Sequence, residues 1–172
     1  MQGGTRHAEM VLFTSLPHGA AHSEKRSGMN DLSHREPCFV WPVRVYYEDT
    51  DSAGVVYYAN YLRYFERART EWLRALGFEQ TDLAAWHQIV FVVRSITVEY
   101  LLPARFNDEL QITVELGAPR ASQIVFVQRV LRGMDLLSEA QVRVACVSVL
   151  TLKPVRIPKT VSAKIRPKTG TP

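Results

Sequence analysis

The stretch from about Asn60 to Leu76 carries the clearest structural signal in the sequence. Its charged side chains fall outside an apolar stripe that repeats at steps of three and four residues, the spacing of one helix face. The stripe consists of Tyr61, Leu62, Phe65, Ala68, Trp72, Leu73 and Leu76. Asn60 is a favourable N-cap residue and Gly77 suits the position just after a helix. The pattern predicts an amphipathic helix over 60–76 that buries one face.

Strand patterns occupy the chain on both sides of this helix. Residues 39–47 are rich in aromatic and β-branched residues, and Pro42 favours an edge position there. A loop or short helical segment at 81–86 is followed by four further strand patterns, with a turn at 133–135 between the last two. These strands are expected at 89–100, 110–116, 124–132 and 142–152. One strand, one long helix and four strands predict an α+β domain in which an antiparallel sheet packs around the helix.

The net charge of +4 is confined to one end of the chain. Residues 38–158 hold thirteen basic and thirteen acidic side chains, and residues 1–37 are also balanced. The excess lies in residues 159–172, which carry no acid and four basic groups: Lys159, Lys164, Arg166 and Lys168. We therefore expect a flexible N-terminal extension (1–37), a neutral domain (38–158) and a basic C-terminal tail (159–172). The neutral body argues against a nucleic-acid partner, whereas the tail suits weak, salt-sensitive contact with an anionic membrane surface.

The cysteines and the hydropathy pattern bear on the cellular compartment. Cys38 and Cys146 are too few and too far apart for a disulfide framework or a zinc site. Cys146 lies in an apolar run, where we expect a small buried thiol. No window approaches the roughly 18 apolar residues that span a membrane, and the apolar run at 10–13 is too short for a signal peptide. A cytoplasmic, reducing setting is therefore expected.

Three carboxylates lie in a compact turn just before the predicted helix: Glu48, Asp49 and Asp51. One interpretation is a solvated acidic connection. A second is a cation site, but the turn lacks the longer run of oxygen donors of a calcium loop and no histidine lies nearby. In a third, Gly54 permits a tight turn and the free N–H groups of the helix start polarise a carbonyl oxygen. An upstream carboxylate would then act as nucleophile or base, which gives an acyl-transfer site without a Ser-His-Asp triad.

The stretch VYYEDTDSAGVVYYANY, residues 45–61, resembles the signature of the 4-hydroxybenzoyl-CoA thioesterase family of hotdog-fold enzymes. Its continuation FERARTEWL, residues 65–73, is similar to the bacterial acyl-CoA thioesterases linked to the Tol–Pal envelope system, the YbgC type. Shorter segments resemble the same subgroup at 91–94, 98–100, 103–105 and 126–129. The resemblance covers residues 39–158. It implies a hotdog fold, with a five-stranded antiparallel sheet wrapped around one long central helix, assembled as a dimer or tetramer with active sites at subunit interfaces.

The resemblance also implies roles for individual residues. Asp51 matches the catalytic aspartate, and the backbone N–H of Tyr58 matches the amide that polarises the thioester carbonyl. Tyr47 matches a tyrosine often placed in the subgroup's site. The subgroup commonly has histidine where this chain has Tyr58, a departure that leaves the acyl-group preference open.

Further residues are candidates for substrate contacts or for structural roles. Gly54 and Asn60 are expected at the substrate, and Arg120, in a turn between two strands, is a candidate contact for a coenzyme A phosphate. His87 is expected to be a surface or structural residue. Glu66 occupies a position from which another hotdog branch uses a glutamate, but with Asp51 present we expect a structural or interface role.

Together these features predict an acyl-CoA thioesterase that acts on short-chain or aromatic acyl groups without a metal or other cofactor. Acyl carrier protein is an alternative carrier of the acyl group. The competing hypothesis is a non-catalytic hotdog module that binds acyl carrier protein or an envelope-assembly partner, and the intact Asp51 and Gly54 argue against it. A hotdog dehydratase is disfavoured because no histidine lies near the predicted helix. The expected location is the cytoplasm, with peripheral contact to the inner membrane through the basic tail.

Overall fold

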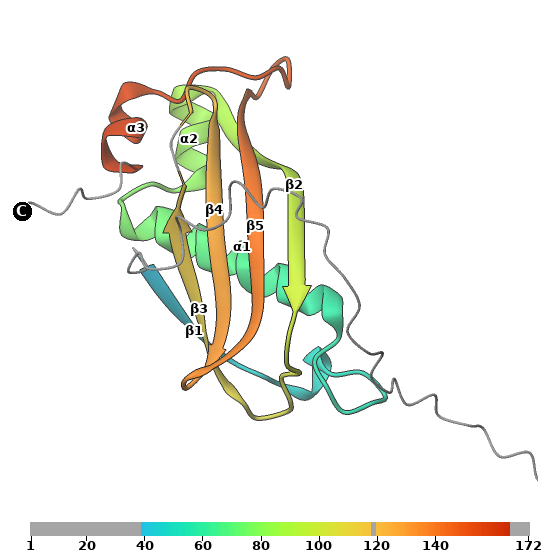
Figure 1. Ribbon diagram of the computed structural model, residues 1–172. Helices are drawn as coiled ribbons and strands as arrows, with labels where there is room; N and C mark the ends of the chain where they lie inside the picture. The colour runs from blue at the N-terminus through green and yellow to red at the C-terminus, as the bar shows by residue number, and fades with distance from the viewer. Residues whose placement is uncertain (1–38, 118–119, 166–172) are drawn as a thin grey trace, which may run out of the picture. The chain divides into compact units, whose positions relative to one another are not determined.

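A computed structural model describes residues 39–117 and 120–165 of the 172-residue chain, and the predicted N-terminal extension (1–37) lies outside them. The sheet has five antiparallel strands in the order β1-β3-β4-β5-β2. Their bounds are β1 (Phe39–Arg44), β2 (Ile89–Tyr100), β3 (Glu109–Leu116), β4 (Gln123–Arg132) and β5 (Asp135–Ser148). The long helix α1 (Tyr58–Ala75) crosses one face of this sheet (Figure 1). The α+β hotdog arrangement expected from the sequence is confirmed.

Helix α1 packs an apolar face onto the sheet. The face is formed by Tyr61, Tyr64, Phe65, Ala68, Trp72 and Leu73, which are all buried. They share one core with inward-facing residues of the strands, such as Ile112 and Val142. Leu62, predicted to belong to this face, is exposed, and Tyr64 takes its place. At about 100° per residue, Tyr64 and Leu62 lie on opposite flanks of the line through Tyr61 and Phe65, and of these two flanking residues only Tyr64 is buried.

The two ends of α1 differ in how well the sequence predicts them. The N-cap is Tyr57 and Asn60 lies within the first turn, so the prediction that Asn60 caps the helix is wrong. At the other end Gly77 has φ +84°, as its predicted position after the helix requires. The N–H groups of Gly77 and Phe78 donate to the carbonyls of Arg74 and Leu73 at 2.7 and 3.1 Å. These two bonds form a Schellman motif.

The strands match their predicted positions with three differences, of which one is that β5 ends at Ser148 and not at 152, because the chain turns at 149–151 and the Leu152 N–H donates to the Ser148 carbonyl at 2.9 Å. β1 is an edge strand that includes Pro42, as expected, but it ends at Arg44 because residues 47–49 form the short 3-10 helix η1 (Tyr47–Asp49). β5 begins at Asp135 rather than at 142, because the tight turn at Gly133 places Asp135 directly opposite Arg132 and pairing continues from there. The short helical segment expected at 81–86 is α2 (Gln80–His87).

The chain continues beyond the sheet into a third helix. α3 (Lys159–Ile165) contributes Val161 and Ile165 to the core, so the first half of the segment interpreted as a basic tail packs on the domain. The ammonium group of Lys164 donates to the Leu76 carbonyl at 3.0 Å, at the end of α1. Arg166 and Lys168 lie outside the described residues.

Two further expectations concern cysteines and membrane spans. Cys146 is a buried free thiol, and burial raises its pKa, whereas Cys38 lies outside the described residues. Within residues 39–117 and 120–165, no helix has the length and apolar character needed to cross a membrane.

Candidate functional site

The acidic segment forms a closed turn between η1 and α1. The N–H of Asp51 donates to the Val55 carbonyl at 2.9 Å, and the N–H of Gly54 donates to the Asp51 carbonyl at 3.0 Å. Gly54 has φ +74°, a conformation that glycine adopts without a steric penalty. The Asp51 carboxylate accepts the Ala53 N–H at 2.8 Å, and the residue is exposed. The turn therefore presents Asp51 to solvent.

Asp49 holds the base of this turn and is only 9% exposed. Its carboxylate accepts the Tyr46 N–H at 2.9 Å. Its carbonyl accepts both the Tyr57 N–H and the side-chain amide of Asn60, each at 2.9 Å. The two aspartates thus have different surroundings: Asp49 is buried and hydrogen-bonded within the fold, whereas Asp51 is exposed to solvent. Among the described residues, no three His, Cys, Asp or Glu side chains gather in a way that could hold a metal ion.

Helix α1 begins directly after the turn. The first N–H groups of a helix have no acceptor within the helix and carry a partial positive charge. Within the described ranges, no oxygen accepts a hydrogen bond from the Tyr58 N–H. The bond from the Tyr57 N–H to Asp49 brings the helix start back to the base of the Asp51 turn. An exposed carboxylate and a free peptide N–H therefore lie on adjoining segments, which suits attack on a carbonyl group.

Tyrosine side chains gather around this helix start. The rings of Tyr57 and Tyr58 lie 4.6 Å apart, and the Tyr100 ring makes edge contacts with Tyr58 and Tyr61 at 6.4 and 5.4 Å. The Tyr100 hydroxyl donates to the Tyr58 carbonyl at 3.1 Å. The pKa of Tyr57 is raised, chiefly by a side-chain hydrogen bond with Tyr58 and also by the negative charge of Asp51. Tyr57, Tyr58 and Tyr100 are all exposed, so they offer an aromatic surface beside the turn.

Two more tyrosines lie close to the turn. Tyr47, in η1, is exposed and stacks on Phe106 with ring centroids 3.9 Å apart. Tyr64 is buried, and its pKa is raised by that burial and by the negative charge of Asp49. Sequence reasoning identified Tyr47 but missed Tyr64 and Tyr100. The three-residue spacing of Tyr64 from Tyr61 could have indicated that Tyr64 lies on the same helix face. Tyr100, at the end of β2, comes close to Tyr58 only because the chain folds.

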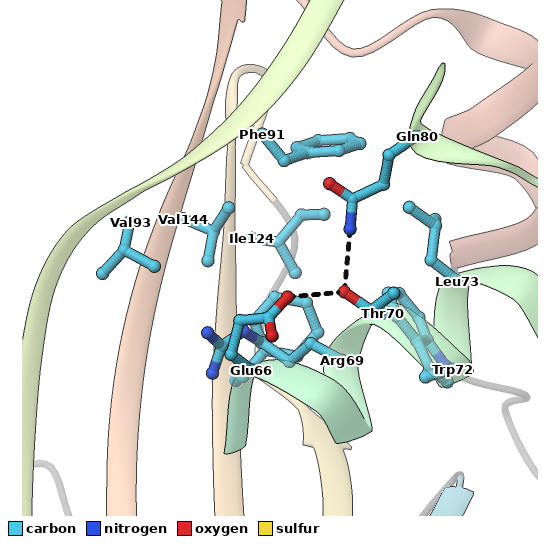
Figure 2. Close-up of a pocket in the computed structure, with 11 residues that line it drawn as sticks. Glu66, Arg69, Thr70, Trp72, Leu73, Gln80, Phe91, Val93, Ile124 and Val144 are labelled. Atoms are coloured by element: carbon cyan, nitrogen blue, oxygen red, sulfur yellow. Dashed lines mark hydrogen bonds between the residues drawn. The ribbon is translucent and has the colours of Figure 1, made fainter. Parts of the chain in front are cut away.

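A cavity of about 100 Å³ lies along α1, two turns from the Tyr58 end (Figure 2). It is lined by Glu66, Arg69, Thr70, Trp72, Leu73, Gln80, Phe91, Val93, Ile124, Phe126 and Val144. The polar side chains at its rim are joined by hydrogen bonds. The Gln80 side-chain amide donates to the Thr70 hydroxyl at 2.8 Å, and that hydroxyl donates to the Glu66 carboxylate at 2.8 Å. Burial lowers the pKa of Arg69 to about 10, while Glu66 acts in the opposite direction. Glu66, expected to be structural or at an interface, thus borders an apolar recess.

The structure does not bring Arg120 to the Asp51 turn of the same chain. The Val45 N–H donates to the backbone carbonyl of Asp108 at 3.0 Å, so the segment that leads to Asp51 lies next to the beginning of β3. Arg120 follows the other end of β3, and eight strand residues span about 27 Å. A contact between Arg120 and a substrate at Asp51 would therefore involve two subunits or a very extended ligand. His87, at the end of α2, is exposed.

Comparisons with known proteins agree with this geometry. Residues 45–165 match the family described as the thioesterase-like superfamily. The acyl-CoA thioester hydrolase YbgC of Escherichia coli O157:H7 is 50% identical over 129 residues, covering 74% of this chain and 96% of that protein. The acyl-CoA thioesterase YbgC of Haemophilus influenzae is 48% identical over 125 residues, covering 73% and 92%. A crystal structure of a probable thioesterase from Bartonella henselae has a TM-score of 0.66 at 36% identity, covering 69% of this chain and 98% of that one.

Proposed function

The chain belongs to the thioesterase-like superfamily and is an acyl-CoA thioester hydrolase, and we propose that Asp51 and the start of α1 carry out its reaction. The observation that carries this proposal is the connection at Asp49. Its carbonyl binds the Tyr57 N–H at 2.9 Å, so the turn that exposes Asp51 closes onto the first turn of α1. The Tyr58 N–H stands next to that closure with no acceptor among the described residues.

In the proposed reaction the Tyr58 N–H donates a hydrogen bond to the thioester oxygen and stabilises the negative charge that develops there. The Asp51 carboxylate either attacks the carbonyl carbon or removes a proton from an attacking water. The carbon–sulfur bond breaks and coenzyme A leaves as its thiolate, which takes up a proton. In the first route, water then hydrolyses the mixed anhydride. Both routes consume one water and release the free acid and coenzyme A, so we propose no cofactor.

The surroundings of the turn support a short-chain or aromatic acyl group. The exposed rings of Tyr57, Tyr58 and Tyr100 give an apolar aromatic surface beside Asp51. Gly54 leaves the backbone open there, because no atom lies within 4 Å of where its Cβ would be.

We also propose that the active unit is a homodimer, or a tetramer built from dimers. β2 is an edge strand, and its exposed residues include Val92, Val93 and Ile96. An exposed apolar edge strand is a ready template for pairing with another chain. Pairing of two β2 strands about a twofold axis would place the two α1 helices side by side. The start of one α1 would then approach the Glu66 cavity of the other.

For the carrier of the acyl group and for the location of the protein, we keep the proposals made from the sequence. Coenzyme A is the preferred carrier of the acyl group, and acyl carrier protein is the alternative. The proposed location is the cytoplasm, with weak contact to an anionic inner-membrane surface through basic residues of 159–172. Lys164 contributes less to such contact, because its ammonium group is bound to the Leu76 carbonyl.

A panel of short-chain, long-chain and aromatic acyl-CoAs tests the proposal with wild type and Asp51→Asn. We expect the wild type to hydrolyse short-chain or aromatic members, and Asp51→Asn to lower kcat by about 10²–10⁴-fold. Glu48→Gln is the matched control, because Glu48 is an exposed carboxylate of the same segment and should leave kcat unchanged. Near-wild-type turnover by Asp51→Asn would refute the role of Asp51. A wild type that binds acyl carrier protein but cleaves no thioester would favour the non-catalytic module.

A further inference from the structure

We infer that Asn60 is a positioning residue of this enzyme, which holds the Asp51 turn against the first turn of α1 by binding the Asp49 carbonyl. This inference rests on the proposed function of Asp51 and Tyr58. It differs from the role expected from the sequence, in which Asn60 contacts the substrate.

The geometry of the Asp49 carbonyl carries the inference. That oxygen accepts two hydrogen bonds from α1 and its N-cap, one from the Tyr57 N–H and one from the Asn60 side-chain amide, each at 2.9 Å. Asp49 is the last residue of η1, and the Asp51 turn follows it directly. The Asn60 side chain therefore joins the segment before the turn to the helix after it.

Asn60 is also placed where a polar side chain requires a partner. It is 6% exposed and lies beside Tyr61, Tyr64 and Phe65 on the buried side of α1. A buried amide without a hydrogen bond is strongly destabilising, so the bond to Asp49 fixes the side chain in one arrangement. An N-cap asparagine normally accepts an N–H of its own helix, whereas the amide of Asn60 donates to a residue outside the helix. The bond thus serves the junction between turn and helix.

The consequence for catalysis follows from the short path between the residues involved. Asp51 is two residues beyond Asp49, and Tyr58 is the residue after Tyr57, so both reacting groups depend on the same carbonyl. Backbone hydrogen bonds also close the turn, and the Asn60 bond is a tie between turn and helix that a side-chain substitution can release. A shift of about 1 Å between reacting groups lowers a rate by about 10²-fold. Loss of the tie is therefore expected to lower kcat and to leave KM nearly unchanged.

The test compares Asn60→Ala and Asn60→Asp with Thr113→Val. Thr113 is 4% exposed, and its hydroxyl accepts the Arg129 N–H at 3.0 Å. It alternates with the core residues Ile112 and Val114, so it faces away from α1. All three variants lose one buried bond between a side chain and the backbone, and all should be less stable than wild type. Only the Asn60 variants should lower kcat, by about tenfold to 10²-fold, with KM changed less than about twofold.

Amide hydrogen exchange gives a second readout. We expect the Tyr57 N–H to exchange faster in the Asn60 variants and at the wild-type rate in Thr113→Val. Equal kcat values for the Asn60 variants and Thr113→Val would overturn the inference, and so would a rise in KM without a fall in kcat. If Asn60→Ala does not fold, Asn60→Ser, whose shorter side chain does not bring its hydroxyl to the Asp49 carbonyl, decides by the same split of kcat and KM. If Asp51→Asn abolishes activity while the Asn60 variants keep it, only the inference fails, and the proposed function stands.

Discussion

Gly54 has a backbone conformation that shapes the turn around Asp51, and substitutions can measure what this conformation contributes to stability and to kcat. It has φ +74°, and a Cβ there would meet no atom within 4 Å, so a substitution changes only backbone conformational energy. Gly133, in the turn between β4 and β5, has φ +58° and the same open surroundings. We expect Gly54→Ala and Gly133→Ala each to lower the free energy of unfolding by about 1 kcal/mol, measured by urea denaturation.

Only Gly54→Ala should also lower kcat, because only Gly54 shapes the Asp51 turn. Gly54→Asn should be milder in both respects, since asparagine tolerates positive φ better than alanine. Equal kcat values for Gly54→Ala and Gly133→Ala would contradict the view that this conformation presents Asp51.

Single residues also mark the limit of what the sequence predicts about the site. The order of residues places Asp49 and Asp51 in one acidic turn, but it does not say that Asp49 turns inward and binds the Tyr46 N–H. Tyr100 is 42 residues from Tyr58, and only the packing of β2 beside α1 brings its hydroxyl to the Tyr58 carbonyl. A motif read along the chain therefore gives candidates for the reacting groups, whereas the residues that would support them come from tertiary packing.

Helix α1 is fixed at its C-terminal end by α3, an element that brings a cation to unsatisfied carbonyls. The ammonium group of Lys164 donates to the Leu76 carbonyl at 3.0 Å and lies 5.0 Å from the centre of the Phe78 ring. A cation near a helix C-terminus and a cation–π contact each contribute about 0.5–1 kcal/mol at exposed sites. We expect Lys164→Met to lower the free energy of unfolding by about 1 kcal/mol, measured by urea denaturation.

Lys159→Met is the control for this prediction, because it removes the same charge from the same helix. Its effect should stay within about 0.5 kcal/mol, as is usual for surface substitutions. A similar loss of stability for both variants would mean that the charge itself, and not its place at the end of α1, stabilises the fold.

At the scale of elements, periodicity predicts where an element lies better than where it begins. The apolar stripe locates α1, yet the helix starts two residues before Asn60, because Tyr57 serves as its N-cap through backbone conformation alone. β5 starts before its predicted apolar run because its earlier residues, such as Ser138 and Gln141, pair with both neighbouring strands, β2 and β4. α3 is only seven residues long, and the four-residue step between Val161 and Ile165 is a weak signal within a basic segment.

At the scale of the whole molecule, the order of the strands is the feature that the sequence leaves open. β1 pairs with β3, and β2 pairs with β5, across long stretches of chain. Alternating apolar residues show that a segment is a strand, but they do not select its partner. The order places β1 and β2 at the two edges of the sheet, so within residues 39–117 and 120–165 each of them has one side without a neighbouring strand.

These two edges allow a matched test of the proposed dimer. Val93 of β2 is 52% exposed and Val40 of β1 is 42% exposed. In a dimer paired through β2, Val93→Arg brings two positive charges close to the twofold axis, which costs several kcal/mol and should raise the dimer dissociation constant by about 100-fold or more. Val40→Arg places the same side chain on the other edge and should leave the dimer intact. Sedimentation velocity over a range of concentrations measures both, and it is the readout of choice because Val93 also lines the cavity along α1. A dimer that survives Val93→Arg and dissociates with Val40→Arg would place the interface on β1 instead, and the Glu66 cavity would then stay apart from the partner's helix start.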